Sequence, residues 1–106
     1  MGQRIPKVES LVQQVVASEL SKALGRNSGR VTVTRVDVSP DMRHAIVWLG
    51  IIGDDKSIFA ILKREQHDIQ KGVSAVMKSK FIPRIEFKHD SGGAHAQDID
   101  RLLKGI

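Results

Sequence analysis

The residues best suited to acid–base or metal chemistry in this chain are its four histidines, His44, His67, His89 and His95. His89 and His95 lie on either side of a Gly-Gly pair beside Asp90, and these three side chains could in principle share a metal ion. No further ligand lies at a spacing that would complete such a site. The sequence also contains no cysteine, no Walker loop and no nucleophile elbow. We therefore expect no enzymatic activity, no metal and no cofactor.

A second concentration of polar side chains lies in the stretch VDVSPDMRHAIVWL, residues 36–49. Ser39-Pro40-Asp41 supplies a hydroxyl that can bond to the following backbone, a preset φ and a short acid, all favoured in a type I turn. Arg43 could contact a phosphate, but we favour an ion pair across the hairpin with an acid such as Asp41. We expect His44 to pack or cap rather than to catalyse. The corner is therefore interpreted as the turn of a hairpin.

The only GxxG segment is Gly50-Ile51-Ile52-Gly53. In an ordinary KH domain, a GxxG loop between two helices clamps about four nucleotides. Here the segment follows an apolar strand and encloses two isoleucines, so we interpret it as a turn at the edge of the core. Aromatic residues make up 4% of the chain, which makes base stacking a poor candidate for the main contact with RNA. Any contact with nucleic acid would therefore have to depend on charge and shape.

The charge balance favours a polyanionic partner, because 17 Lys and Arg against 12 Asp and Glu give a net charge of +5. Such a surplus can also serve only to keep a small domain soluble. The most one-sided stretch is residues 71–88, and a second basic cluster combines the N-terminus with the loop after the first predicted helix. We expect Lys56 and Lys63, early in the second predicted helix, to lie on the face of the domain opposite the basic stretch of residues 71–88. The candidate RNA-binding residues are Arg4, Lys7, Arg26, Arg30, Lys71, Lys78, Lys80, Arg84 and Lys88.

Two classes of non-enzymatic function fit these residues. One is RNA binding, and the other is an interaction module whose basic face meets an acidic partner protein. Counterion release makes RNA binding steeply dependent on salt, so the salt dependence of binding separates the two.

Length and composition suit a single domain. We place it at residues 1–106, with an extension from about residue 90, because 106 residues with 41% hydrophobic content can bury one modest core. The absence of cysteine fits a reducing compartment. No apolar run reaches the length of a signal peptide or a membrane span. We expect a cytoplasmic protein that does not enter a membrane.

Hydrophobic periodicity predicts the first three elements. Apolar residues recur at three- and four-residue steps from Pro6 to Leu24, which predicts a helix that ends at the turn-forming residues 25–29. The following VTVTRVDV, residues 31–38, alternates valines but changes phase across Thr34 and Arg35, which predicts a strand with a β-bulge. From Ala45 to Ile51 both faces are largely apolar, so this second strand should be central or covered by helices.

A second helix should begin after Gly53, with Asp54 or Asp55 as its cap, and continue to about Lys80. Its apolar stripe is interrupted at residues 64–68, which indicates a bend or a turn that leaves the core.

Pro83 should end this helical segment, and Ile85 and Phe87 alternate with polar residues as a half-buried third strand. Residues 99–106 read as a short amphipathic helix. The predicted fold is a two-layer α+β domain with a mixed three-stranded sheet and its helices on one face, the element order of a type II KH domain.

Three segments, VTVTRVDVSPDMRHAIVWL, FIPRIEFKHDS and DIDRLL, resemble the ribosome-binding factor A family, and the resemblance covers nearly the whole chain. The resemblance implies a KH-like assembly factor without catalytic activity. Its partners would be the small (30S) ribosomal subunit and its 16S rRNA, whose late maturation at the 5′ end region it would assist before dissociating. We expect a monomer. In the KH-like arrangement, the exit of the second helix and the third strand would border the RNA groove.

One departure from the family pattern concerns the kink between its two central helices, where the family usually has a small-residue Ala-x-Gly. Counting back from Pro83 places the kink at Glu65-Gln66-His67, none of which is small. The segment between the second strand and this point is also shorter than usual in the family. Either the second helix has lost a turn, or the bend has moved to residues 72–75, where small residues do occur.

Overall fold

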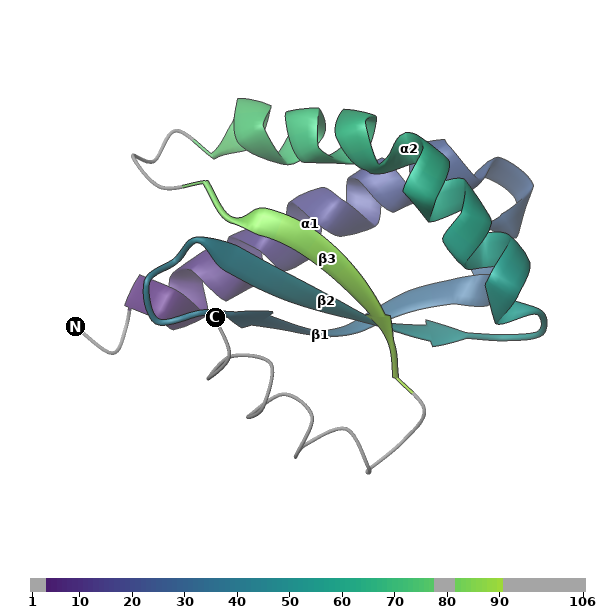
Figure 1. Ribbon diagram of the computed structural model, residues 1–106, viewed down its shortest axis with the longest axis horizontal. Helices are drawn as coiled ribbons and strands as arrows, with labels where there is room; N and C mark the ends of the chain where they lie inside the picture. The colour runs from purple at the N-terminus through teal and green to yellow at the C-terminus, as the bar shows by residue number, and fades with distance from the viewer. Residues whose placement is uncertain (1–3, 78–81, 91–106) are drawn as a thin grey trace.

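The computed structural model describes residues 4–77 and 82–90 of the chain. Figure 1 shows two long helices on one face of a three-stranded sheet, which confirms the predicted two-layer α+β fold. The elements are α1 (Arg4–Leu24), a short 3-10 helix η1 (Gly25–Arg30), β1 (Val31–Val38), β2 (His44–Ile51), α2 (Asp55–Val76) and β3 (Arg84–His89). The predicted C-terminal helix, and the extension from about residue 90 that contains it, lie outside the described residues.

β2 is the central strand of the sheet, as its apolar faces predicted. It pairs antiparallel with β1 and parallel with β3, so the sheet is mixed and α2 lies in the crossover between the parallel strands. The register of β1 shifts between Val33 and Arg35, which confirms the predicted β-bulge. Because of the extra residue, valines on both sides of the bulge pack against the core.

The hydrophobic core lies between the sheet and the two helices. Its buried members include Val12, Val16 and Leu20 of α1, Ala45, Val47 and Leu49 of β2, and Ile58, Leu62, Ile69 and Val73 of α2. On the opposite face of β2, Ile46 and Trp48 are 0% and 3% exposed, so this strand is buried on both faces. The indole N–H of Trp48 donates a hydrogen bond of 2.9 Å to the carboxylate of Asp37. Within the described residues, neither helix is long and apolar enough to cross a membrane.

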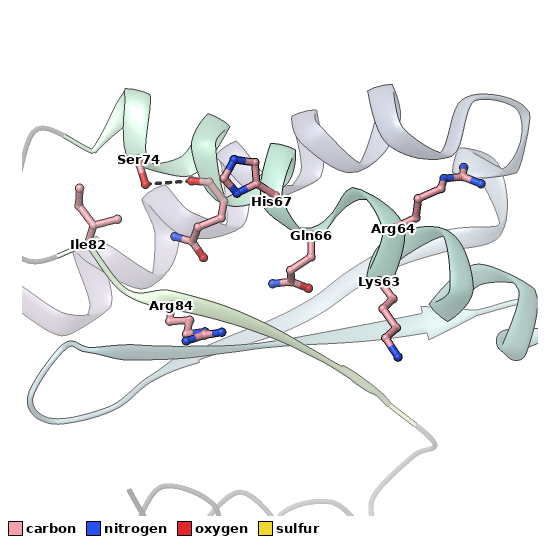
Figure 2. Close-up of a pocket in the computed structure, with 8 residues that line it drawn as sticks. Lys63, Arg64, Gln66, His67, Ser74, Ile82 and Arg84 are labelled. Atoms are coloured by element: carbon pink, nitrogen blue, oxygen red, sulfur yellow. Dashed lines mark hydrogen bonds between the residues drawn. The ribbon is translucent and has the colours of Figure 1, made fainter.

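α2 is one continuous helix with a bend in its middle. Asp54 caps it, because its carboxylate accepts a hydrogen bond of 3.0 Å from the backbone N–H of Lys56. Figure 2 shows the axis changing direction between Arg64 and His67, inside the gap in the apolar stripe. The described helix ends at Val76 rather than near residue 80, since the backbone is already extended at Met77.

Candidate nucleic-acid interface

The corner between β1 and β2 is a turn held by its own side chains, as predicted. Asp41 Oδ1 accepts hydrogen bonds from the Ser39 hydroxyl at 2.6 Å and from the backbone N–H of Arg43 at 3.0 Å. The Ser39 hydroxyl oxygen accepts a further bond of 3.1 Å from the backbone N–H of His44. The bond from the Ser39 hydroxyl, followed by the one from the Arg43 N–H, lowers the pKa of the Asp41 carboxyl. The hydrogen bond from Arg43 to Asp41 therefore comes from the backbone N–H and not from the guanidinium group, although the Arg43 charge also helps to lower the pKa of the Asp41 carboxyl.

The GxxG segment belongs to the end of β2 and the turn into α2. Gly50 pairs with Thr32 inside the sheet, and Gly53 adopts a φ of +90°, a conformation that favours glycine. The segment is therefore a structural turn at the edge of the sheet, as interpreted from the sequence, and it does not join two helices.

Arg30 holds this turn through its guanidinium group. Its Nε donates to the carbonyl oxygen of Ile52 at 2.8 Å, and a terminal nitrogen donates to the carbonyl oxygen of Asp54 at 3.0 Å. A third bond, of 3.2 Å, reaches the side-chain oxygen of Asn27. The same guanidinium packs against Gly53. Arg30, predicted from the sequence as an RNA contact, thus directs three of its donors at the protein itself, two at backbone carbonyls and one at the Asn27 side chain.

The second basic cluster predicted from the sequence is divided between the two ends of α1. Arg4 and Lys7 belong to the first turns of this 21-residue helix, whereas Arg26 and Arg30 follow its last turn. At 1.5 Å per residue, roughly 30 Å of helix separates the two pairs. The expectation of one cluster is therefore wrong, because a helix that is continuous between the pairs keeps them apart. Lys7 and Arg26 are both exposed.

The basic run of residues 71–88 is also spread over several surfaces. Lys71 is exposed on α2. On β3, Arg84 lies opposite His44 and the half-buried Lys88 lies opposite Trp48, so the two cations are at different ends of the strand. Lys78 and Lys80 lie outside the described residues.

Arg84 instead lies beside the cations of α2, in a groove between α2 and β3 with a volume of about 640 Å³. In Figure 2, Lys63 and Arg64 lie toward one end of this groove, Ile82 toward the other, and Arg84 on the β3 side. No acidic side chain is among the eight described residues that line it, which are Lys63, Arg64, Gln66, His67, Gln70, Ser74, Ile82 and Arg84. We refer to this cavity as the α2–β3 groove.

Two glutamines of α2 hold β3 along the groove. The side-chain oxygen of Gln70 accepts a bond of 2.9 Å from the N–H of Ile85, and its nitrogen donates at 3.0 Å to the carbonyl of Pro83. Gln66 donates at 2.7 Å to the carbonyl of Ile85. These groups lie on the outer edge of the sheet, where no further strand pairs with them among the described residues. The two walls of the groove are therefore joined by hydrogen bonds.

The groove corrects one assignment and adds residues that sequence reasoning missed. Lys63 was expected on the face opposite Arg84, but the two side chains line the same groove. Arg64 and His67 were not predicted as contacts. The signal that could have found them is the gap in the apolar stripe of α2, because polar residues at three- and four-residue steps share one helix face.

The histidines do not form a metal site among the residues described. His89 Nδ1 lies 3.6 Å from Asp55 Oδ2, which joins the end of β3 to the start of α2. Within residues 4–77 and 82–90, no group of three or more potential metal ligands occurs. His95 lies outside these residues.

Comparisons with known proteins agree with this fold. The family model of Ribosome-binding factor A matches residues 4–103. Ribosome-binding factor A of Geobacter metallireducens is 36% identical over 110 residues, which cover 100% of this chain and 93% of the relative.

Solved structures of the same family share the architecture. The crystal structure of ribosome-binding factor A from Thermus thermophilus has a TM-score of 0.74 at 17% identity, over 84% of this chain and 98% of that chain. A homology model of the Thermus thermophilus factor, fitted into the cryo-EM map of a 30S complex, has a TM-score of 0.53 at 19% identity, over 74% and 97% of the two chains. The family model and the close relative show that this chain belongs to the ribosome-binding factor A family, which is a family of ribosome-binding factors and not of enzymes.

Proposed function

We propose that this protein is an assembly factor that binds the immature small ribosomal subunit through its 16S rRNA, assists late maturation of the 5′ end region and then dissociates. Membership of the ribosome-binding factor A family supports the ribosome as partner. The Thermus thermophilus relative that was fitted into the map of a 30S complex supports the small subunit in particular. Such a function belongs in the cytoplasm, where small subunits mature.

The observation that carries the RNA contact is the composition of the α2–β3 groove. Lys63, Arg64 and Arg84 are three cations among the residues that line one groove, and no acidic residue is among its described lining side chains. The exposed Arg64 also pairs with Glu65 at 3.9 Å, so it would exchange this partner for a phosphate. Oriented cations of this kind neutralise phosphates and release counterions from RNA. The hydrogen bonds of Gln66 and Gln70 hold the two walls together, so the backbone positions that carry the cations are fixed before RNA binds.

The remaining candidates from the sequence stay proposals for contacts outside the groove. Those within the described residues are Arg4, Lys7, Arg26, Lys71 and Lys88, and those outside them are Lys78 and Lys80. We assign Arg30 to the turn into α2 instead, because its guanidinium donates to two backbone carbonyls there.

Co-sedimentation with purified ribosomal particles over a range of salt concentrations tests the proposed partner. The protein should sediment with free small subunits and not with large subunits. The logarithm of its affinity should fall linearly with the logarithm of the salt concentration, and the three groove cations alone should contribute about two to three to the steepness of this slope. Equal binding to large subunits would contradict the proposal. Binding to small subunits but not to protein-free 16S rRNA would indicate a protein partner instead.

The role in maturation needs a separate measurement. In cells that lack the protein, primer extension on 16S rRNA should show extended 5′ ends, and expression of the protein should restore the mature end. Normal 5′ ends in such cells would remove the maturation role and leave subunit binding intact.

A further inference from the structure

Gln66 and Gln70 both bond to β3, but they differ in what their amides leave free. Gln70 uses its oxygen and one N–H. Gln66 uses one N–H, so its oxygen and its second N–H have no partner among the described residues. Within the described part of the chain, no buried side-chain oxygen lacks a partner, so this oxygen of Gln66 is open to solvent. Because the carbonyl of Ile85 can only accept, it also determines which end of the Gln66 amide is the nitrogen.

We propose that Gln66 reads a nucleobase of single-stranded RNA in the α2–β3 groove, with adenine preferred; this inference rests on the proposed function and specifies the RNA that the same groove binds. A side-chain amide offers one acceptor and one donor, which complement the amino group and a ring nitrogen of adenine. Unpaired RNA exposes these edges, whereas the deep major groove of an A-form duplex does not.

The surroundings of Gln66 suit one unpaired base and its flanking phosphates. Lys63 lies beyond Gln66 toward one end of the groove and points to the same side of α2, where it can neutralise the RNA backbone, whereas Arg64 points away from β3 (Figure 2). Ile82, toward the other end, is 40% exposed and offers an apolar surface for a base or sugar. The bond to Ile85 limits the rotation of the Gln66 amide, so less conformational entropy is lost when a base binds.

Single-stranded RNA oligonucleotides that differ at one base test the assignment. One carries adenine in a uridine-rich context, and the other carries purine riboside, which lacks the amino group, at the same position. Wild-type protein should bind the adenine oligonucleotide roughly ten-fold more tightly. Gln66→Met, which keeps the bulk of the side chain but has no amide, should bring this ratio close to one.

Gln70→Met is the matched control on the same helix. It should loosen β3, seen as faster hydrogen exchange of the Ile85 amide, and weaken the binding of both oligonucleotides alike, because Gln70 lines the groove and holds its β3 wall. The ratio of the two affinities should stay near the wild-type value, because the Gln70 oxygen is already engaged by the Ile85 N–H. Gln66→Met should leave that amide protected, since Gln66 bonds only to the Ile85 carbonyl. If Gln66→Met does not fold, Gln66→Asn, which is one methylene shorter, should lose the preference in its place.

A wild-type ratio near one, or no binding of either oligonucleotide, would overturn the base-reading role. So would a preference that persists in folded Gln66 variants but disappears in Gln70→Met. Co-sedimentation with the small subunit is measured on the same preparations. Protein that sediments but shows no adenine preference keeps the proposed function and loses this inference, whereas protein that fails to sediment loses the proposed function.

Discussion

The carboxylate of Glu19 in α1 lies against Gly72 in α2, in the space that any larger side chain at position 72 would need. The same carboxylate pairs with Lys22 at 3.5 Å. The two helices therefore approach each other at a residue without a side chain. This contact gives a reason for a glycine inside a helix, where it costs about 1 kcal/mol relative to alanine.

The first prediction is that the effect of Gly72→Ala depends on Glu19. In the wild-type background, the gain in helix propensity is offset by displacement of the carboxylate, so the free energy of unfolding should stay level or fall. In a Glu19→Ala background, the same substitution should raise it by about 1 kcal/mol. Urea denaturation of the wild-type protein, the two single variants and the double variant gives these free energies. If Gly72→Ala changes the free energy of unfolding equally in both backgrounds, the contact between Glu19 and Gly72 does not affect stability.

The second prediction concerns Arg30. Arg30→Met removes the donors to the carbonyls of Ile52 and Asp54, so the free energy of unfolding should fall by roughly 1 to 2 kcal/mol. Folded Arg30→Met should bind the small subunit with the wild-type salt dependence. Arg26→Met is the control in the same loop, and its effect on unfolding should stay within about 0.5 kcal/mol. A flatter salt dependence in Arg30→Met would show that Arg30 contacts RNA after all.

The third prediction follows from the lowered pKa of Asp41. Its carboxyl has a folded-state pKa below the ordinary value of 3.8, chiefly because of the Ser39 hydroxyl. Such a group stabilises the fold above its unfolded pKa, and this contribution is lost as the pH falls through the folded pKa. Asp41→Ala should therefore unfold at a lower temperature than wild type at neutral pH, and the gap should narrow below about pH 4.

Thermal unfolding of both proteins from acidic to neutral pH checks this sign. A gap that stays constant into acid would show that the carboxylate charge is not the stabilising feature. Small-subunit binding of folded Asp41→Ala should match wild type at neutral pH, because the corner is a turn. A stable variant that no longer bound the subunit would make the corner part of the interface.

The strands and the bulge were predictable because each depends on residues close together in the sequence, and the mixed sheet was predictable because the link from β2 to β3 is long enough for a parallel crossover. Apolar residues on both faces of β2 indicated its central position, and the change of phase near Thr34 indicated the bulge. The cap at Asp54 was one of two adjacent candidates, both visible in the sequence. The interrupted apolar stripe likewise indicated the bend of α2 between Arg64 and His67.

The groove was less predictable, because it depends on contacts between distant segments. The gap in the stripe does not reveal which element its polar residues will meet, and Lys63 was therefore assigned to the wrong face. The density of basic residues along the chain also predicted one continuous surface for residues 71–88, but Arg84 and Lys88 lie at different ends of β3. The carbonyls that engage Arg30 lie 22 and 24 residues away, beyond the reach of local patterns.

The last prediction locates the RNA-binding face on the groove. Combined replacement of Lys63, Arg64 and Arg84 by Ala should flatten the salt dependence of small-subunit binding by about two to three units. This follows because each phosphate contact contributes about 0.7 on single strands and 0.9 on duplexes. Stability should barely change, since all three side chains are exposed.

The matched control is a second triple variant that replaces Lys22, Arg35 and Lys56 by Ala. It removes the same total charge, so any effect of net charge on association is common to both variants. All three residues are exposed, none of them lines the groove, and none is a proposed RNA contact. The control triple should therefore keep the wild-type salt dependence of small-subunit binding. If the control triple flattens the salt dependence and the groove triple does not, RNA binds elsewhere on the protein and the α2–β3 groove serves another purpose.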